Sequence, residues 1–390
     1  MSRTEALGPV RDGVRTLHPG YFALVMATGI VSIGLHADHQ DALSVALLWL
    51  AGLAYAVLLI ATAYRLVSFR SELATDLADP ARAFGFFTFV AGTDVLGARL
   101  ALDAHHRAAL ALLAVGWVAW IVLGYVVPWT AVLGRPVRPV LESANGSWFI
   151  WVVASQSVAT LAATLQPVLG GGRRELALVA VFSWSVGAFL YPAVAMLVGT
   201  RLLLYPLRPA ELTPPYWVSM GATAITVVAG AAIVDMADAP MVDATRGLVA
   251  GTSVLFWAFG TWLIPVLVAG GVWRHVIHRV PLRYEPTLWS IVFPLGMYGV
   301  AGESLGQADH LPIVHAIGAG EIWVALGAWV VTCADAAPSG PHRPRDPERP
   351  GRALSPRRPA RDRSAAAVIQ SVRAMCIGWW VSPRYSSASQ

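Results

Sequence analysis

The sequence contains no lysine, and it is poor in charge of either sign. All 28 basic residues are arginine, and charged residues make up only 13% of the 390 positions. Soluble domains carry roughly 25% charged residues, so this composition argues against a water-soluble fold. The two cysteines, Cys333 and Cys376, lie far apart without partner spacing, which argues against a disulfide framework and a zinc site.

Motifs for enzymatic chemistry are also missing. The sequence has no HExxH, GxSxG or Walker pattern. One acidic pair, Asp76 and Asp79, lies in the stretch SFRSELATDLADPAR, where the pattern favours a surface helix over a magnesium site. We therefore expect no catalytic residue, cofactor or metal. A polytopic membrane enzyme, and a sensor or scaffold, are kept only as alternatives.

Apolar residues are what the chain has in excess, at 56% with a mean hydropathy of +0.59. Ten apolar stretches each approach the ~20 residues that cross a bilayer. Lipid cannot satisfy unpaired backbone groups, so each stretch is predicted to be helical. The expected fold is an all-α integral membrane protein. Its predicted spans are 20–36, 42–64, 83–101, 107–133, 146–168, 175–200, 214–236, 246–272, 286–306 and 312–334.

Arginine indicates the orientation, because positive residues concentrate in cytoplasmic connections. Most arginines outside the tail fall on the side of the N-terminus. The opposite side holds only Arg107, Arg173, Arg174 and Arg246, in loops that are otherwise acidic or rich in histidine. We expect a multi-pass protein of the cell membrane with both termini cytoplasmic. Residues 1–18 would form a cytoplasmic segment and 19–335 the transport domain.

The last part of the chain, 336–390, has a different composition. It is rich in proline and arginine, as in APSGPHRPRDPERPGRALSPRRPARDRS, and is expected to be a disordered cytoplasmic tail. Its charge suits contact with anionic lipid. Nucleic-acid binding has no supporting fold, so no nucleic-acid partner is expected.

The spans repeat in pairs. Each odd span opens with an aromatic residue followed by small residues, at Tyr21, Phe86, Trp148, Trp217 and Trp289. Three even spans also carry a proline near the end predicted to be cytoplasmic: Pro128, Pro192 and Pro265. Such regular spacing predicts five helical hairpins. The alternative is that the aromatics only mark the membrane interface.

Five equivalent hairpins close most simply into a ring around a central pore, in a quasi-five-fold arrangement. The odd spans are richer in small and hydroxyl residues and are the expected inner helices. The pore-lining candidates are Thr28, Gly29, Thr93, Ser155, Thr223 and Gly296. Small residues are also common wherever membrane helices pack closely, so packing is the competing explanation.

Phe293 precedes Pro294 in the ninth span, WSIVFPLGMYG. Seven helical residues rise about 10 Å, which places the ring near mid-membrane. A kink at Pro294 would aim the ring at the axis, where it would act as a pore gate. The alternative is a ring packed between helices beside a tolerated proline.

Four ionisable residues lie within predicted spans: Asp94, Arg99, Glu303 and Glu321. Such groups are costly in a membrane and are usually functional. They would form an ion-paired cluster, or they would carry protons alongside an anion. Arg99 is a candidate either to attract anions or to neutralise Glu303.

The stretches HPGYFALVMATGIVSIGL, FFTFVAGTDVLGARL and LWSIVFPLGM, with the ten-span layout, resemble the tellurite-resistance/C4-dicarboxylate transporter family, which is related to plant slow anion channels. The resemblance covers about residues 18–335. It implies ten helices as five hairpins around a pore, assembly as homotrimers, and a phenylalanine before a proline on the ninth helix that occludes the pore. Phe293 and Pro294 match those positions.

By this resemblance the substrates are small anions: C4-dicarboxylates such as malate, or inorganic ions such as chloride and nitrate. Tellurite resistance is a further activity of some bacterial members. We expect a membrane anion channel that is not an enzyme. A proton-coupled carrier with alternating access is the alternative.

Overall fold

The computed structural model describes residues 11–134, 138–169, 171–237, 239–308 and 310–336. Every regular element within these ranges is helical, and none is a strand. The expected disordered tail and most of the N-terminal segment lie outside the described residues. The α-helices are α2 (Ala23–Ala37), α3 (Asp41–Ser68), α4 (Arg70–Ala78), α5 (Phe87–Leu102), α6 (His106–Val127), α7 (Phe149–Leu165), α8 (Arg173–Leu204), α9 (Val218–Val234), α10 (Pro240–Val272), α11 (Trp289–Ala308) and α12 (Pro312–Asp335).

Each of the ten predicted spans corresponds to one of these helices, and α4 is the short surface helix between the second and third. In the described part of the chain, nine helices are long and apolar enough to cross a membrane. The remaining one, α11, spans 20 residues but carries Glu303 and several glycines. The protein is therefore an all-helical, multi-pass membrane protein.

Five of the helices, α2, α5, α7, α9 and α11, contact one another in a closed order: each packs on the next, and α11 packs on α2. We call these the inner helices. In four of them, 67–83% of the most apolar window is buried, against 6–39% in the outer helices α3, α6, α8, α10 and α12. Nearly all of α11 is buried as well.

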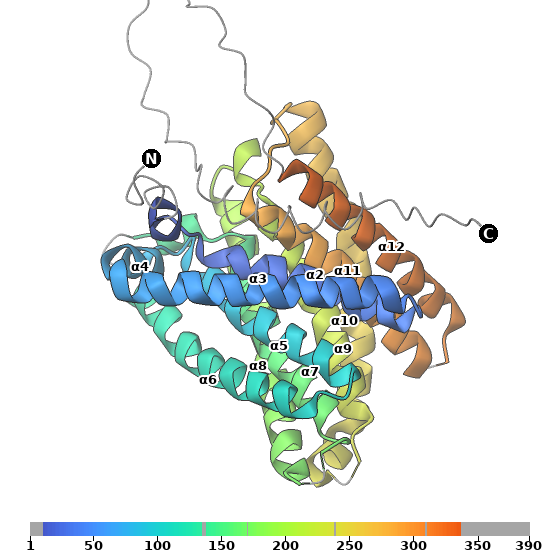
Figure 1. Cartoon of the computed structure of the whole chain (residues 1–390). Helices are drawn as coiled ribbons and strands as arrows, with labels where there is room; N and C mark the ends of the chain where they lie inside the picture. Colours follow the sequence, from blue (N-terminus) through green and yellow to red (C-terminus); the bar gives the residue numbers. More distant parts are fainter. Residues whose placement is uncertain (1–10, 135–137, 170, 238, 309, 337–390) are drawn as a thin grey trace, which may run out of the picture.

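Each inner helix is followed in the chain by an outer helix that packs against it: α3 on α2, α6 on α5, α8 on α7, α10 on α9 and α12 on α11. Figure 1 shows α2 alongside α3 and α11 alongside α12. The outer helices expose large apolar side chains, among them Trp49, Phe189 and Trp262. This distribution suits helices that face lipid.

Small residues let the inner helices approach closely. A Cβ added at Gly29 would lie 2.8 Å from Val95 on α5, and one added at Gly221 would lie 2.9 Å from Pro294 on α11. Any larger side chain at these positions would force the helices apart. Helix α11 continues through Pro294, which packs against α9 at Gly221.

A hydrogen bond ties each outer helix to the inner helix that follows it around the ring. Trp329 on α12 donates to Thr28 Oγ1 on α2 at 3.0 Å. Four further bonds join corresponding helices: Tyr55 to Thr93 (3.0 Å), Trp120 to Ser155 (2.9 Å), Trp184 to the Thr226 carbonyl (3.1 Å) and Thr261 to Tyr298 (2.8 Å). Every junction between neighbouring helix pairs thus has a polar contact.

Candidate functional site

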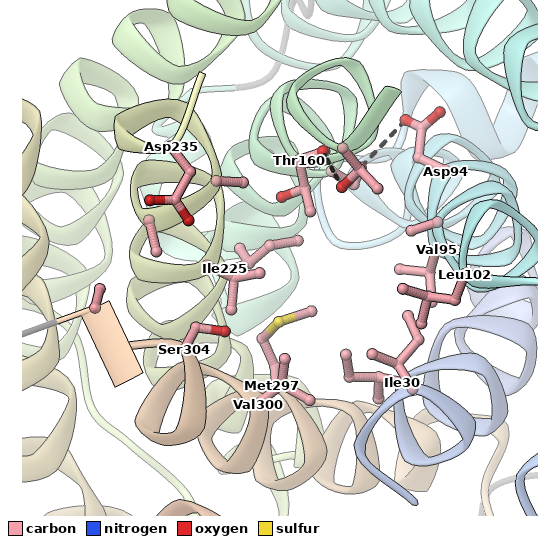
Figure 2. A pocket seen from close by; sticks show the side chains of 18 of the residues that line it. Ile30, Asp94, Val95, Leu102, Thr160, Ile225, Asp235, Met297, Val300 and Ser304 are labelled. Carbon is pink, nitrogen blue, oxygen red and sulfur yellow. Dashed lines mark hydrogen bonds between the residues drawn. The ribbon is translucent and has the colours of Figure 1, made fainter. Parts of the chain in front are cut away.

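The inner helices enclose a cavity of about 520 Å³ between their C-terminal halves. All five contribute to its wall, as Figure 2 shows for Ile30, Val95, Thr160, Ile225 and Met297. We call it the C-terminal cavity. The wall is mainly apolar, with Ser157, Thr160, Thr164 and Ser304 as hydroxyl groups and Asp94 and Asp235 as acids.

A second cavity, of about 180 Å³, lies at the opposite ends of the same helices, and we call it the N-terminal cavity. Its lining comes from the segments that lead into all five inner helices. Polar residue types form a larger share of its lining residues than in the first cavity. The side chains include His18, Arg82, Asn145, Ser147, Glu285 and Ser290.

Phe293 lies between these cavities. Ser290 lines the N-terminal cavity and Met297 lines the C-terminal one. Residues three and four apart share one face of a helix, so Phe293 lies on the same face of α11 as both. Its side chain is 0% exposed.

The other inner helices carry alanine at the level of Phe293. Ala27, Ala91, Ala154 and Ala222 each lie about one turn before a residue of the C-terminal cavity wall. All four are 0% exposed. At this level the five inner helices therefore combine four small side chains with one aromatic ring.

The hydroxyl residues expected to line the pore point elsewhere. Thr28, Thr93 and Ser155 bond to the outer helices α12, α3 and α6. Thr223 packs against Gly260 of α10. None of these four lines either cavity.

The two glycines in the predicted set also serve helix packing. Gly29 faces Val95 on α5, and Gly296 faces Ile30 on α2, each within 2.9 Å of the position a Cβ would take. All six residues of the predicted set thus make contacts between helices.

Asp94 is buried on α5 and belongs to the C-terminal cavity wall. Ser157 on α7 donates to its Oδ2 at 3.4 Å, and its Oδ1 has no hydrogen-bond partner among the described residues. The carboxyl group lies against α6 at Gly116, where an added Cβ would overlap it. Figure 2 shows Asp94 at the edge of the cavity.

Arg99 is fully buried, and its contacts hold helices together. Its Nη1 pairs with Asp103 Oδ1 at 2.7 Å, and its Nε donates to Ser32 and Ser44 at 3.0 and 3.1 Å. These contacts join α5 to α2 and α3. The partner of Arg99 is Asp103, which the sequence analysis did not single out, rather than Glu303.

Glu303 and Glu321 lie apart from both residues. Glu303 lines a shallow depression with His39, His310 and His315, beyond the C-terminal end of α2. Glu321 is half-buried on α12. The four intramembrane charges thus occupy separate places. Among the described residues, no group of three histidine, cysteine or acidic side chains is arranged to hold a metal ion.

His18 precedes the first inner helix and borders the N-terminal cavity. Its Nδ1 accepts a hydrogen bond from the Gly20 backbone N–H at 3.0 Å. Burial, and then the nearby positive charge of Arg82, lower the pKa of His18 to about 4. The ring is therefore neutral at physiological pH, and Arg82 supplies the positive charge at this end.

Sequence reasoning missed the side chains that do line the C-terminal cavity, such as Thr160, Met297 and Ser304. On α11 the lining residues 297, 300, 304 and 307 recur every three or four positions, and residue 308 adjoins the last of them. Steps of three or four residues from Phe293 reach Met297 and Val300, so these lining residues could have been predicted from the sequence by helical periodicity.

Comparison with known proteins matches residues 16–336 to the model of a family described as voltage-dependent anion channel. A membrane protein of Mycobacterium tuberculosis, described as uncharacterized, is 72% identical over 144 residues, which cover 37% of this chain and 73% of that protein. An uncharacterized transporter of Methanocaldococcus jannaschii is 25% identical over 338 residues, covering 84% of this chain and 94% of the other.

A second uncharacterized transporter of the same archaeon is 24% identical over 335 residues. The family match covers almost the whole described part of the chain and confirms the resemblance drawn from the sequence. It groups the chain with channels and transporters, not with enzymes. The chain belongs to the voltage-dependent anion channel family.

Proposed function

We propose that the chain conducts small anions through a central pore that Phe293 closes. The five inner helices would surround this pore as quasi-five-fold repeats, and α11 would be the tenth transmembrane helix. The closed order of contacts among the inner helices supports this arrangement. So does the hydrogen bond at each of the five junctions.

The observation that carries the proposal is the position of Phe293. Two cavities are each bordered by all five inner helices or the segments that lead into them, and Phe293 stands on α11 between Ser290 of one wall and Met297 of the other. A phenyl group in a narrow apolar passage excludes water and ions, so its removal would join the cavities. Pro294 fixes the neighbouring turn against Gly221, which holds the ring in place.

The proposed substrates are small anions, either inorganic ions such as chloride and nitrate or C4-dicarboxylates such as malate. Tellurite resistance would follow as an effect on the cell. The family match supports anions as the class. The mainly apolar wall of the C-terminal cavity suits ions that shed part of their hydration shell.

We further propose that the N-terminal cavity faces the cytoplasm, as the distribution of arginine suggests, with both termini on that side. Residues 1–18 and 336–390 would flank the ten-helix domain 19–335. The protein would assemble as a homotrimer in the cell membrane. The exposed aromatic and aliphatic side chains of the outer helices provide surface for contact with lipid and with other copies.

A proton-coupled carrier with alternating access is the second candidate, and Asp94 is the observation in its favour. Its carboxyl group reaches the C-terminal cavity with one oxygen unpartnered among the described residues. A group that binds and releases a proton there would couple anion movement to pH. A channel predicts flux that follows the anion gradient alone, whereas a carrier predicts flux that a pH gradient drives and that Asp94→Asn uncouples.

Flux into vesicles tests the proposal. Chloride, nitrate and malate uptake would be measured for the native chain, Phe293→Ala and Phe87→Ala, with and without a pH step. Lowering a barrier by about 1.4 kcal/mol raises a rate tenfold, so we expect at least that increase for Phe293→Ala. Phe87 is equally buried, stacks on Trp151 and lines neither cavity, so its variant should stay closed. Unchanged flux in Phe293→Ala would count against the gate.

A further inference from the structure

Arg82 borders the N-terminal cavity and shares its carboxylate partner with a second arginine. Asp76 Oδ2 pairs with Arg65 Nη2 at 2.6 Å, and its Oδ1 lies 2.9 Å from Arg82 Nε, an ion-pair distance but out of line for a hydrogen bond. One carboxylate therefore serves two guanidinium groups. Arg65 is buried, whereas the Arg82 side chain is 38% exposed and borders the cavity.

The backbone that carries Arg82 is held in place from the segment that leads into α7. Trp148 Nε1 donates to the Pro80 carbonyl at 2.9 Å, and Asn145 Nδ2 donates to the Ala81 carbonyl at 3.3 Å. These bonds fix the two residues before Arg82. The guanidinium group therefore extends from a backbone segment that is already ordered, so little backbone entropy is lost when the group binds a ligand.

Ser147 provides a second feature of the same cavity. It is buried and belongs to the wall, and its Oγ has no hydrogen-bond partner among the described residues. Its backbone N–H is already used by Asn145 Oδ1 at 2.8 Å. A buried hydroxyl without a partner costs free energy, so a ligand in the cavity is its natural partner.

The helices also contribute. All five inner helices begin at this cavity, and none of their opening turns carries an acidic residue. The N-terminal end of a helix bears partial positive charge, so five of them add to the charge of Arg82. The carboxylate at the rim, Glu285, is engaged by Arg274 at 3.5 Å and by Thr287 at 3.1 Å.

We propose that the N-terminal cavity is an anion-binding site in which Arg82 and Ser147 hold the anion before it passes the layer of Phe293. The site takes a small anion with hydrogen-bond acceptors, such as nitrate, chloride or a carboxylate. The inference rests on the proposed anion transport in giving the site a role. It goes further by naming the residues that capture the ion at this mouth.

Thermal unfolding of the purified full chain in detergent tests the site. Sodium nitrate would replace sodium gluconate at constant sodium, and the shift in midpoint gives the apparent nitrate affinity. Arg82→Gln should weaken that affinity about tenfold, because a charge-assisted bond is lost. Ser147→Ala should weaken it about threefold, because one neutral donor is lost.

Two matched variants act as controls. Arg15→Gln removes an arginine of an exposed ion pair with Glu72, and Ser183→Ala removes another buried hydroxyl without a partner among the described residues. Neither residue lines the cavity, so both should bind nitrate as the native chain does. If Ser147 were only structural, its alanine variant would change the midpoint without nitrate but not the affinity.

Flux through Phe293→Ala vesicles, measured in parallel, separates this inference from the proposed function. One outcome is that Phe293→Ala vesicles conduct nitrate while Arg82→Gln and Ser147→Ala keep the native nitrate affinity. This outcome would overturn the site and leave the proposed channel intact. Nitrate affinity that depends on both residues, without flux in Phe293→Ala, would support the site and count against the channel. Equal stabilisation of all variants by nitrate would also overturn the site.

Discussion

The imidazole ring of His18 caps the start of the first inner helix and also has a lowered pKa. It accepts the Gly20 N–H at the start of the first inner helix, and burial, followed by the charge of Arg82, lowers its pKa from 6.5 to about 4. The folded pKa lies below the unfolded one, so acid favours the unfolded chain. The contribution of His18 to stability is complete above about pH 6.5 and declines as the pH falls towards 4.

We predict that His18→Asn removes this pH dependence. Asparagine keeps a capping acceptor and does not titrate. Between about pH 7.5 and pH 5, the native chain should lose about 2 kcal/mol more stability than His18→Asn. Thermal unfolding in detergent at both pH values measures the difference, with the exposed His105→Asn as control. Equal losses in the native chain and His18→Asn would show that the ring titrates as it does in water.

Arg99 is the most deeply buried charge among the described residues, and Asp103 is its acidic partner. Removing that partner leaves a guanidinium group in the interior with only hydroxyl contacts. Asp103→Asn should therefore destabilise the protein by about 2 kcal/mol, less than for a fully enclosed pair because Asp103 is 27% exposed. Asp41→Asn, which alters an exposed pair with His36, should cost little. A similar small loss in both variants would contradict the structural role of Arg99.

At the scale of helices, α11 and α12 approach each other very closely. A Cβ at Gly318 would lie 2.5 Å from the Glu303 backbone N and 2.6 Å from the Gly299 carbonyl, so the two backbones almost touch. Gly320, two residues further on α12, has no heavy atom within 4 Å of its Cβ position. Gly318 and Gly320 therefore provide a tightly packed and an open position on the same helix, at which the same substitution can be compared.

Gly318→Ala should destabilise the chain by at least about 1–3 kcal/mol, because the helices must separate. Gly320→Ala should be neutral or slightly stabilising, because alanine is the better helix former. Thermal unfolding of the two variants gives the contrast. A stable Gly318→Ala chain would mean that α11 and α12 are not in the contact described.

The hydrogen bonds between outer and inner helices predict a coupling that a double-mutant cycle measures. Trp329→Phe and Thr28→Val each remove one partner of the bond between α12 and α2. Such bonds in membrane proteins contribute about 0.6 kcal/mol on average, so the coupling energy should be of that order. Strictly additive effects would indicate that the bond does not form in the membrane.

The sequence was sufficient to predict the helices and their pairing, because apolar length and repeated aromatics mark them directly. It was not sufficient to predict how each inner helix is rotated. Thr28, Thr93 and Ser155 lie seven positions after Tyr21, Phe86 and Trp148, so their recurrence was visible in the sequence. A hydroxyl in a membrane protein is satisfied equally by a pore or by a neighbouring helix, and here the neighbouring helices provide the partners.

For the whole molecule, we propose one path that is closed at one layer. Ala27, Ala91, Ala154, Ala222 and Phe293 are all fully buried, and in this proposal the ring of Phe293 fills the room that the four small side chains leave. The motif in the sequence was enough to single out Phe293. The four alanines at its level could be identified only from the arrangement of the helices. The contacts of the charged residues were harder to predict: the acidic partner of Arg99 is one helical turn away at Asp103, but its hydroxyl partners, Ser32 and Ser44, come from α2 and α3.

Single-channel conductance in planar bilayers tests this central claim most directly. Replacing Phe293 with leucine, valine and alanine removes progressively more of the side chain from the layer between the cavities. We predict an anion conductance near zero for the native chain that rises in the order leucine, valine, alanine, with Phe87→Ala remaining closed. Equal conductance across the series, or none in any member, would contradict a pore closed by this ring.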